Sequence, residues 1–398
     1  MNEGIEQLEQ NPIVVKYEGD KEIEFKFEVT ENLMDNKTRQ IALGLHGAFC
    51  LMCTYSRSAA KDLAMIEQGF EINRSLEQIK EIFHRLAEVD DNGELYVPRK
   101  ANDYGSRQGV TGPPLTNQDL CKDLSPLHAW LRCFTFSLNL IYRLVARVYK
   151  WGGIGTHNER WTTAETKRFE TAKKLVKQLV RDHLKLQIDF VLPAGGGSTD
   201  TGPLVKAFYK KVNRDKFIEH CLPNIVPGNP ITEDEKSYLY DFLQNMNVIL
   251  RILGSGRKCE TDRLDQFCKK TYMDLVRHFP WVQMSMVAHM VLAHTTERII
   301  RNDGFGLKDI SEQGLEGLHK ILRNVRKDLS RKNSLYLQIQ DVFKFMWTQS
   351  DPQVRAMRRR LECSQCLATS HTKRGCPELK NNVIHDEDND LVNSLLLD

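Results

Sequence analysis

Residues 288–334 read AHMVLAHTTERIIRNDGFGLKDISEQGLEGLHKILRNVRKDLSRKNS and hold two pairs of side chains of the kinds that bind metal ions. The first pair, His289-x4-His294, lies in a helical region. The second pair, Glu312 and Glu316, is spaced so that on a helix both carboxylates share one face. Neither pair alone completes the ligand shell of a protein metal site, so each needs ligands from elsewhere in the chain.

The histidine pair has candidate partners in Cys50-x2-Cys53, which follows a strand region near the N-terminus. Alone, this cysteine pair lacks the strand-helix-strand context of a redox motif, and two histidines on an apolar helix are more often hydrogen-bonded core groups. Together the two pairs supply the Cys2His2 set of a structural zinc site. The spacing leaves both interpretations open, because more than 230 residues separate the two halves.

The glutamate pair stands at the start of a strongly basic helix. Its basic residues are Lys320, Arg323, Arg326, Lys327, Arg331 and Lys332. Carboxylates hold hard cations such as Mg2+, and Lys and Arg hold a DNA strand, so the pattern suits Mg2+-dependent phosphoryl transfer on DNA. A surface helix laced with ion pairs is the alternative interpretation.

A third group of ligands closes the chain, with the spacing Cys-x2-Cys-x4-His-x4-Cys. Its members are Cys363, Cys366, His371 and Cys376. Four such ligands within 14 residues can enclose zinc with almost no core of their own. Zinc knuckles mostly hold single-stranded or flexible nucleic acid, which agrees with the neighbouring arginines at 358–360. The box therefore predicts a second structural zinc ion in a CCHC knuckle.

The hydrophobic pattern predicts a mostly α chain that opens with a β-hairpin. The hairpin strands are expected at residues 13–17 and 22–29. From about residue 57 the pattern is helical almost everywhere, with helices expected at 75–88, at 163–186 and from Thr232 to near Gly254. Thr232 with Glu235 fits a capping box, and residues 90–118 are expected to form a long loop.

Composition and charge indicate the cellular compartment and the kind of partner to expect. The chain has 41% hydrophobic and 27% charged residues, no apolar stretch long enough for a membrane helix and no secretory signal. Its ten cysteines are therefore expected to be free thiols or metal ligands in a reducing compartment. Residues 301–376 are basic and 377–398 are acidic, which favours a polyanionic partner, with a solvated surface as the alternative.

Several motifs resemble one family. The stretch at 288–334 resembles the C-terminal catalytic segment of Transib-type transposases and of the catalytic subunit of the V(D)J recombinase, in which a His-x4-His zinc pair precedes the last acid of a DDE triad. Upstream, EIEFKFEVTENLMDNK and GAFCLMC resemble the strand with the second catalytic Asp and the Cys-x2-Cys half of the zinc site. SPLHAWLRCFTFSLNLIYRLVARVYKW and PAGGGSTDTG resemble the family's helical insertion, so the likeness covers roughly residues 22–350.

The resemblance implies the roles of individual residues. Glu316, with Glu312 beside it, matches the last catalytic acid, and Asp35 matches the second, with Glu31 as the alternative. Both acids would bind Mg2+ or Mn2+, and Cys50, Cys53, His289 and His294 would form one zinc site. In the family the triad holds two metal ions that activate water and then a DNA 3′-hydroxyl for attack on phosphorus, which nicks DNA and forms hairpins.

The implied organisation has five parts. These are partial RNase H-like strands with the second catalytic Asp (1–49), a helical zinc-binding insertion (50–300), a catalytic helix and a C-terminal helix (301–350), the knuckle (351–377) and an acidic disordered tail (378–398). A nuclear homodimer on DNA with an accessory recombination-activating subunit is implied as the working assembly.

One departure from the family pattern limits the expected activity. In the family the first catalytic Asp precedes the second by about a hundred residues, and only about 35 residues precede Asp35 here. The isolated chain is therefore expected not to cleave DNA. The alternative function is a truncated or domesticated zinc-dependent nucleic-acid-binding protein without catalysis, and a helical scaffold with accidental motifs is a third reading.

Overall fold

The structure is a computed structural model of the chain of 398 residues. It describes residues 13–17, 21–25, 36–46, 49–55, 59–89, 92–93, 95–97, 107–117, 120–121, 123–148, 163–189, 200–225, 231–308, 322–350 and 387–397. The chain divides into two compact units. Unit 1 comprises Met1–Ser311 with Leu391–Asp398, and unit 2 comprises Glu312–Asp390.

The prediction of a mostly helical chain is confirmed. The helices of unit 1 are α2 (Asn36–Ala42), α3 (Leu63–Gln68), α4 (Leu76–Leu86), α6 (Pro126–Val148), α7 (Thr163–Leu179), α8 (Gly202–Tyr209), α9 (Lys211–Lys216), α10 (Leu222–Ile225), α11 (Glu233–Leu253), α12 (Thr261–His278) and α13 (Met286–Ile300), with short 3-10 or π-helical turns at η1 (Ala59–Lys61), η2 (Val180–Leu184) and η4 (Phe217–Cys221). None of the helices within the described ranges is long and apolar enough to cross a bilayer.

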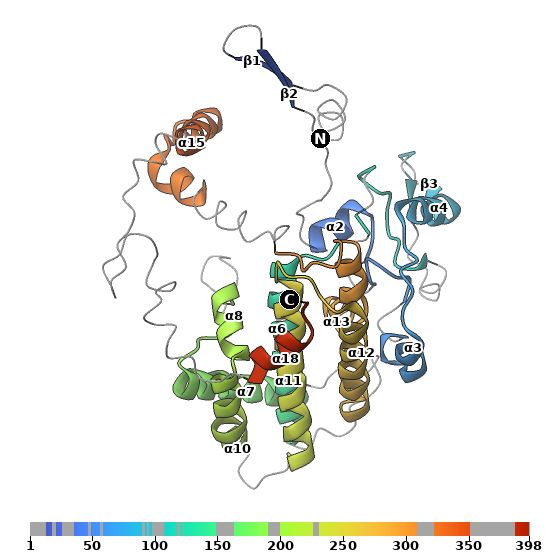
Figure 1. The fold of residues 1–398 in the computed structure, drawn as a ribbon, viewed down its shortest axis with the longest axis vertical. Coiled ribbons are helices and arrows are strands. Elements are labelled where there is room, and N and C mark those ends of the chain that lie inside the picture. The colour runs from blue at the N-terminus through green and yellow to red at the C-terminus, as the bar shows by residue number, and fades with distance from the viewer. Residues whose placement is uncertain are drawn as a thin grey trace. The chain divides into compact units, whose positions relative to one another are not determined.

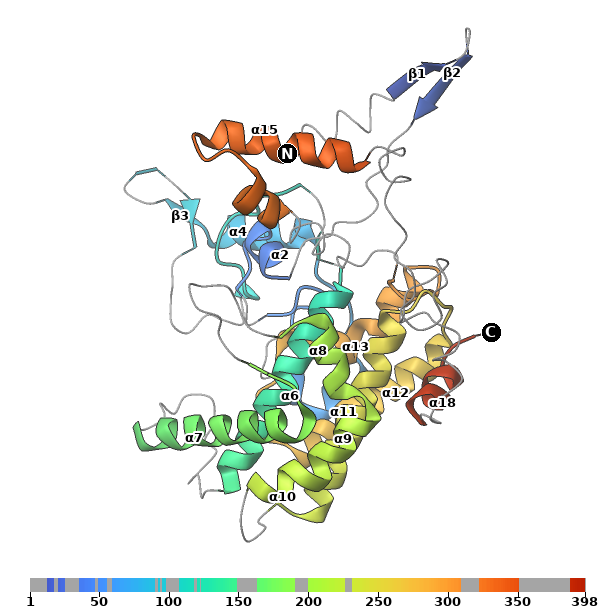
Figure 2. The same ribbon diagram turned by 90° about the vertical axis from the view of Figure 1, so that its left-hand side faces the viewer.

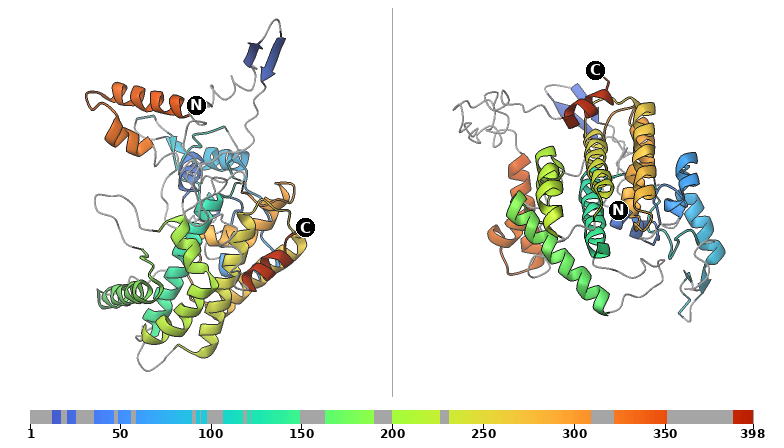
Figure 3. Two further views of the ribbon diagram at one scale, coloured as in Figure 1. Left: turned by 60° about the vertical axis from the view of Figure 1, so that its left-hand side comes forward. Right: turned by 90° about the horizontal axis from the view of Figure 1, so that it is seen from below.

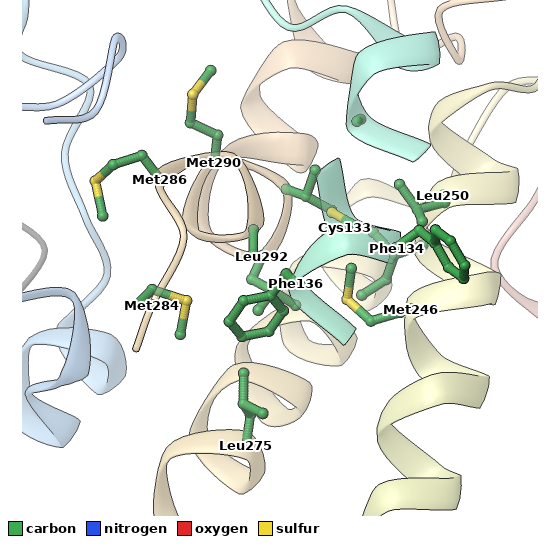
Figure 4. Packing of buried hydrophobic residues seen from close by; sticks show 14 of the residues in the cluster. Cys133, Phe134, Phe136, Met246, Leu250, Leu275, Met284, Met286, Met290 and Leu292 are labelled. Atoms are coloured by element: carbon green, nitrogen blue, oxygen red, sulfur yellow. The ribbon is translucent and has the colours of Figure 1, made fainter. Parts of the chain in front are cut away.

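Four long helices, α6, α11, α12 and α13, run side by side and form the centre of unit 1 (Figure 1). Each contributes a buried apolar face, and α13 is buried on most of its surface because it packs against the other three. Figure 4 shows how Phe136, Met246, Leu275 and Leu292 from the four helices meet in this core. Met246, Met284, Met286 and Met290 are also buried in this core, where flexible side chains suit irregular packing.

A second group of helices packs on the outer side of α6. Both α7 and α8 contact α6, and α7 runs across the bundle axis (Figures 2 and 3). The helix predicted at 163–186 is confirmed as α7, which continues into the π-helical turn η2 and ends where Lys185 takes a left-handed conformation (φ 59°). Ala172 and Val176 of α7 are buried, and two of its basic residues, Lys173 and Lys177, form ion pairs with Asp189 at 3.1 Å.

Local sequence signals set several helix ends where they were expected. Thr232 and Glu235 form the predicted capping box of α11, and this helix ends at Gly254. Each partner of the box bonds the other's backbone amide, which satisfies two donors of the first turn. Ser75 likewise caps α4, whose buried residues Leu76, Ile79, Ile82 and Phe83 recur at helical spacing.

The strands form two small ladders. β1 (Ile13–Tyr17) pairs antiparallel with β2 (Lys21–Phe25), which confirms the N-terminal hairpin. Residues 26–29 of the predicted second strand lie outside the described residues. A second ladder joins β3 (Glu88–Val89) to β4 (Leu95–Tyr96), so part of the predicted 90–118 loop is a strand. Within the described ranges these two ladders are the only sheets, and the implied RNase H-like core stays a prediction.

Residues 387–397 correct the expectation of a disordered tail, because they contain the helix α18 (Glu387–Ser394). Val392 of this helix and Leu395 and Leu396 just after it are buried, and the backbone of Leu396 bridges Cys259 in front of α12. Arg263 also donates to the Ser394 carbonyl at 3.0 Å. The acidic composition concealed this short apolar stripe, whose burial favours order.

Unit 2 contains the π-helical turn η5 (Val325–Leu329) and α15 (Leu335–Ser350). The helical run ends at Ser330, so Arg331 and Lys332 lie outside the basic helix that the sequence predicts. Arg331 instead forms a forked ion pair with Asp341 of α15, at 2.9 and 3.0 Å. This pair lowers the pKa of Asp341 to about 2.

Candidate metal centre

The Cys-x2-Cys pair lies on a tight, fully buried loop. The amide of Met52 donates to Cys50 Sγ at 3.3 Å and curls the loop back on itself. Phe49, just before it, packs on Gly109, where φ is +88° and an added Cβ would lie 2.5 Å from the phenyl ring. Glycine at 109 therefore permits the close approach that presses this loop into the body.

The two histidines come from α13, which begins at the Ser285 cap. Both side chains are completely buried, and their ring centroids lie 5.2 Å apart at a right angle. Residues five apart on a helix are separated by about 140° around its axis, so the two rings converge only by leaning toward a common point. The point toward which they lean is the cysteine loop.

Cys50, Cys53, His289 and His294 together form a group whose ligand atoms all lie within 4.8 Å of one another. Tetrahedral zinc with Zn–S and Zn–N bonds of about 2.3 and 2.0 Å needs ligand atoms about 3.3–3.8 Å apart. The observed spacing is therefore within about 1 Å of a closed tetrahedron. The group can hold a metal ion, and its two sulfurs and two imidazoles are compatible with zinc.

A tyrosine behind His289 selects the tautomer that can bind a metal. The hydroxyl of Tyr272 donates its one proton to the Ala60 carbonyl at 2.6 Å. It must therefore accept from His289 Nδ1, which lies 2.9 Å away. The lone pair of His289 is thus on Nε2, the atom that lies 3.3 Å from Cys53 Sγ. Phe70 packs edge-on against the ring and helps to fix its plane.

A glutamate fixes the tautomer of His294 in the same way. Glu297, one turn further along α13, lies with Oε2 3.1 Å from His294 Nδ1, so the carboxylate holds the proton on that nitrogen. The other nitrogen, Nε2, is buried and has no hydrogen-bond partner among the described residues. A buried polar atom without a partner is costly, and a metal ion at the centre of the group would supply one.

The charges in the group are also those of a cation site. Burial raises the pKa of Cys50, but the neighbouring side chains of Cys53, His289 and His294 outweigh burial and hold this pKa well below its usual range. The neighbouring Cys50 and burial raise the pKa of Cys53. Two adjacent thiolates repel, so both can ionise only with a cation between them. Burial lowers the pKa of His289, which keeps this ligand neutral. Burial also acts to lower the pKa of His294, but Cys50 and Glu297 outweigh burial and raise this pKa to about 9. This imidazole must therefore lose a proton when a metal ion binds.

Arg74 clamps the cysteine loop from behind. Its side chain is 1% exposed and donates from Nε to the Cys53 carbonyl at 3.2 Å and from Nη2 to the Gln108 carbonyl at 2.9 Å. Its own amide donates to the Met52 carbonyl. Burial lowers the pKa of Arg74, while the nearby thiols at Cys50 and Cys53 favour its charged form. The buried guanidinium and the backbone amide of Arg74 thus hold the cysteine loop in place through hydrogen bonds to its carbonyls.

Three residues that support the ligands escaped prediction from the sequence: Arg74, Tyr272 and Glu297. Glu297 could have been found, since it lies three residues after His294 and thus one turn away on the same helix. Tyr272 and Arg74 carry no comparable local signal, because α12 and the segment just before α4 reach the site only through the fold. Tyr272 and Glu297 also line a surface cavity of about 370 Å³.

We expect Tyr272→Phe to weaken zinc binding about 10- to 100-fold, because the ring of His289 loses the acceptor that fixes its tautomer. Zinc affinity is measured by competition with a coloured chelator. The matched control is Tyr209→Phe, which removes a buried hydroxyl bonded to Ser137 at 2.8 Å, away from the site. Equal zinc affinities in the two variants would contradict the role assigned to Tyr272.

The other predicted site residues do not form a second site within the described residues. Asp35, Glu31, Glu312, Glu316, Lys320 and the box Cys363, Cys366, His371 and Cys376 lie outside the described residues. Arg323, Arg326, Lys327, Arg331 and Lys332 are exposed in unit 2. Arg326 donates to Gln338, and Arg331 is committed to Asp341. The described part of the chain thus supplies one complete candidate site, the Cys2His2 group.

No protein-family model matches the chain, and no curated protein matches it.

Proposed function

We propose that this chain is part of a DDE recombinase-transposase, a DNA-binding enzyme that nicks DNA and transfers strands by Mg2+-dependent phosphoryl transfer. One observation carries the proposal: a buried ligand set unites Cys50-x2-Cys53 with His289-x4-His294. The resemblance to Transib-type transposases and to the catalytic subunit of the V(D)J recombinase implies this same union. Two weak half-motifs that meet in space support the resemblance better than either half does alone.

In this proposal the Cys2His2 zinc is structural. Four protein ligands leave no open coordination position, so the ion does not activate water. It ties the segment that follows Asp35 to the helix that precedes Glu316. Asp35 and Glu316 are the two proposed Mg2+ or Mn2+ ligands.

The remaining parts of the proposal follow from the resemblance and from charge. The second zinc is held by the knuckle at 351–377, which grips DNA beside the arginines at 358–360. The basic residues 320–332 hold the phosphate backbone. The working assembly is a nuclear homodimer on DNA, with an accessory recombination-activating subunit.

Iron-directed cleavage tests whether the two acids share a cation. With zinc-loaded full chain, millimolar Fe2+, ascorbate and hydrogen peroxide, Fe2+ at the site reduces peroxide to hydroxyl radicals, which should cut the backbone near residue 35 and near residue 316. Excess Mg2+ should suppress both cuts, and Glu316→Gln should remove them, because one of the two carboxylates is lost. Fragments are located by mass spectrometry.

Glu312→Gln is the matched control, since it removes a carboxylate four residues away and should leave both cuts in place. Cuts at only one of the two positions, or cuts that Glu316→Gln leaves unchanged, would contradict a shared site. DNA binding together with that result would favour the other function class, a zinc-dependent nucleic-acid-binding protein without catalysis.

A further inference from the structure

A cationic cavity of about 430 Å³ lies along α6, and the zinc centre does not use it. One stripe of α6 forms a wall, with residues at helical spacing from Arg132 through Asn139 to Arg143. Phe169 of α7 and residues 282–285, just before α13, complete the lining. A cavity of this size is in the range that holds small ligands in proteins.

Two arginines set the charge of this cavity. Arg132 and Arg143 are eleven residues apart on α6, which places their Cα atoms about 16 Å apart along the axis. Arg143 donates from Nη2 to Gln283 Oε1 at 2.5 Å, so its guanidinium is oriented at the cavity wall. Arg132 is exposed and has no ion-pair or hydrogen-bond partner among the described residues. The lining includes no Asp or Glu within the described ranges.

The rest of the lining suits a ligand that is partly flat and apolar. Phe169 is half-buried, and Phe136 and Leu140 form the apolar part of the α6 wall. Ser285, which caps α13, also faces the cavity, so the positive end of that helix dipole adds to the field of the arginines. Aromatic rings beside guanidinium groups are how proteins hold bases and phosphates of the same nucleotide.

We propose that this cavity binds a nucleotide unit, with Arg132 and Arg143 on its phosphates and Phe169 against its base. The unit is either part of a nucleic acid strand or a free nucleotide. Guanidinium groups bind phosphate through forked, charge-assisted hydrogen bonds, and the described lining of the cavity holds two of them and no carboxylate. If the unit belongs to a nucleic acid strand, the inference rests on the proposed function and deepens it. If the unit is a free nucleotide, the inference is independent of the proposed function.

The test uses zinc-loaded full chain and two probes, adenosine diphosphate and a short fluorescent oligodeoxythymidine. Binding is measured by calorimetry for the first probe and by anisotropy for the second, at one fixed salt concentration. Arg132→Gln should weaken binding about tenfold, and the double variant with Arg143→Gln should weaken it further, because each removes charged hydrogen bonds to phosphate. Phe169→Leu should weaken binding about tenfold with the charge unchanged.

The matched control is the pair Lys270→Gln and Arg277→Gln on exposed positions of α12, which makes the same change in net charge. Loss of binding to both probes in the cavity variants assigns a free-nucleotide site. Loss for the oligonucleotide alone assigns the strand. If both probes bind the cavity variants and the α12 control with equal affinity, the proposal is overturned. Arg132→Gln alone decides the matter if the double variant fails to fold, since Arg132 is exposed.

Discussion

Cys50→Ala is expected to remove one zinc equivalent per chain and to lower the free energy of unfolding by more than about 4 kcal/mol. The loop at Cys50 has little secondary structure, so its attachment to α13 depends on the ligand set. Losing one ligand also leaves the Nε2 atom of His294 buried without a partner. Because metal affinity and folding are coupled, the two losses should appear together.

The measurements are zinc content by elemental mass spectrometry and urea unfolding followed by helical circular dichroism. Cys268→Ala is the matched control: this cysteine is also buried, on α12, and is no member of the ligand group. It should keep all its zinc and lose about 1 kcal/mol, as expected for a small cavity. Cys363→Ser should also lose one equivalent, but without a large loss of stability. Full zinc content in Cys50→Ala would refute the assignment of this ligand.

Arg74→Met is the second change with a large expected effect, a loss of about 3 kcal/mol of stability. Methionine fills similar space but cannot donate to the carbonyls of Cys53 and Gln108, which the guanidinium bonds in the buried interior. Those carbonyls then lose charge-assisted partners. The freed loop should also bind zinc about tenfold more weakly, because ligand positions depend on the groups behind them.

Arg85→Met provides the comparison, since Arg85 lies on the exposed side of α4. It should change stability by less than about 0.5 kcal/mol and leave zinc affinity unchanged. Both quantities come from the same urea and chelator titrations. Similar stability for the two variants would mean that the buried position of Arg74 contributes nothing specific to the site.

Local physics accounts for what could be predicted. The Thr232–Glu235 capping box, the end of α11 at Gly254 and the apolar stripe of α4 depend on neighbours within a few residues, and each was expected where it occurs. The same reasoning failed at α18, where acidic residues outnumber the apolar ones. Its stripe gains its free energy only from the surface around Cys259, which no local window contains.

In the candidate site, too, some features follow from residue type and others only from the packing of the helices. Ligand chemistry is a property of residue type, so the cysteine and histidine pairs were identifiable as metal ligands, and their union came from the family resemblance. The convergence of His289 and His294 from opposite sides of α13, the tautomer set by Tyr272 and the clamp by Arg74 arise from helix packing. Spacing along the chain carries no information on such contacts. They form between segments that are distant in the sequence and meet only when the hydrophobic core folds.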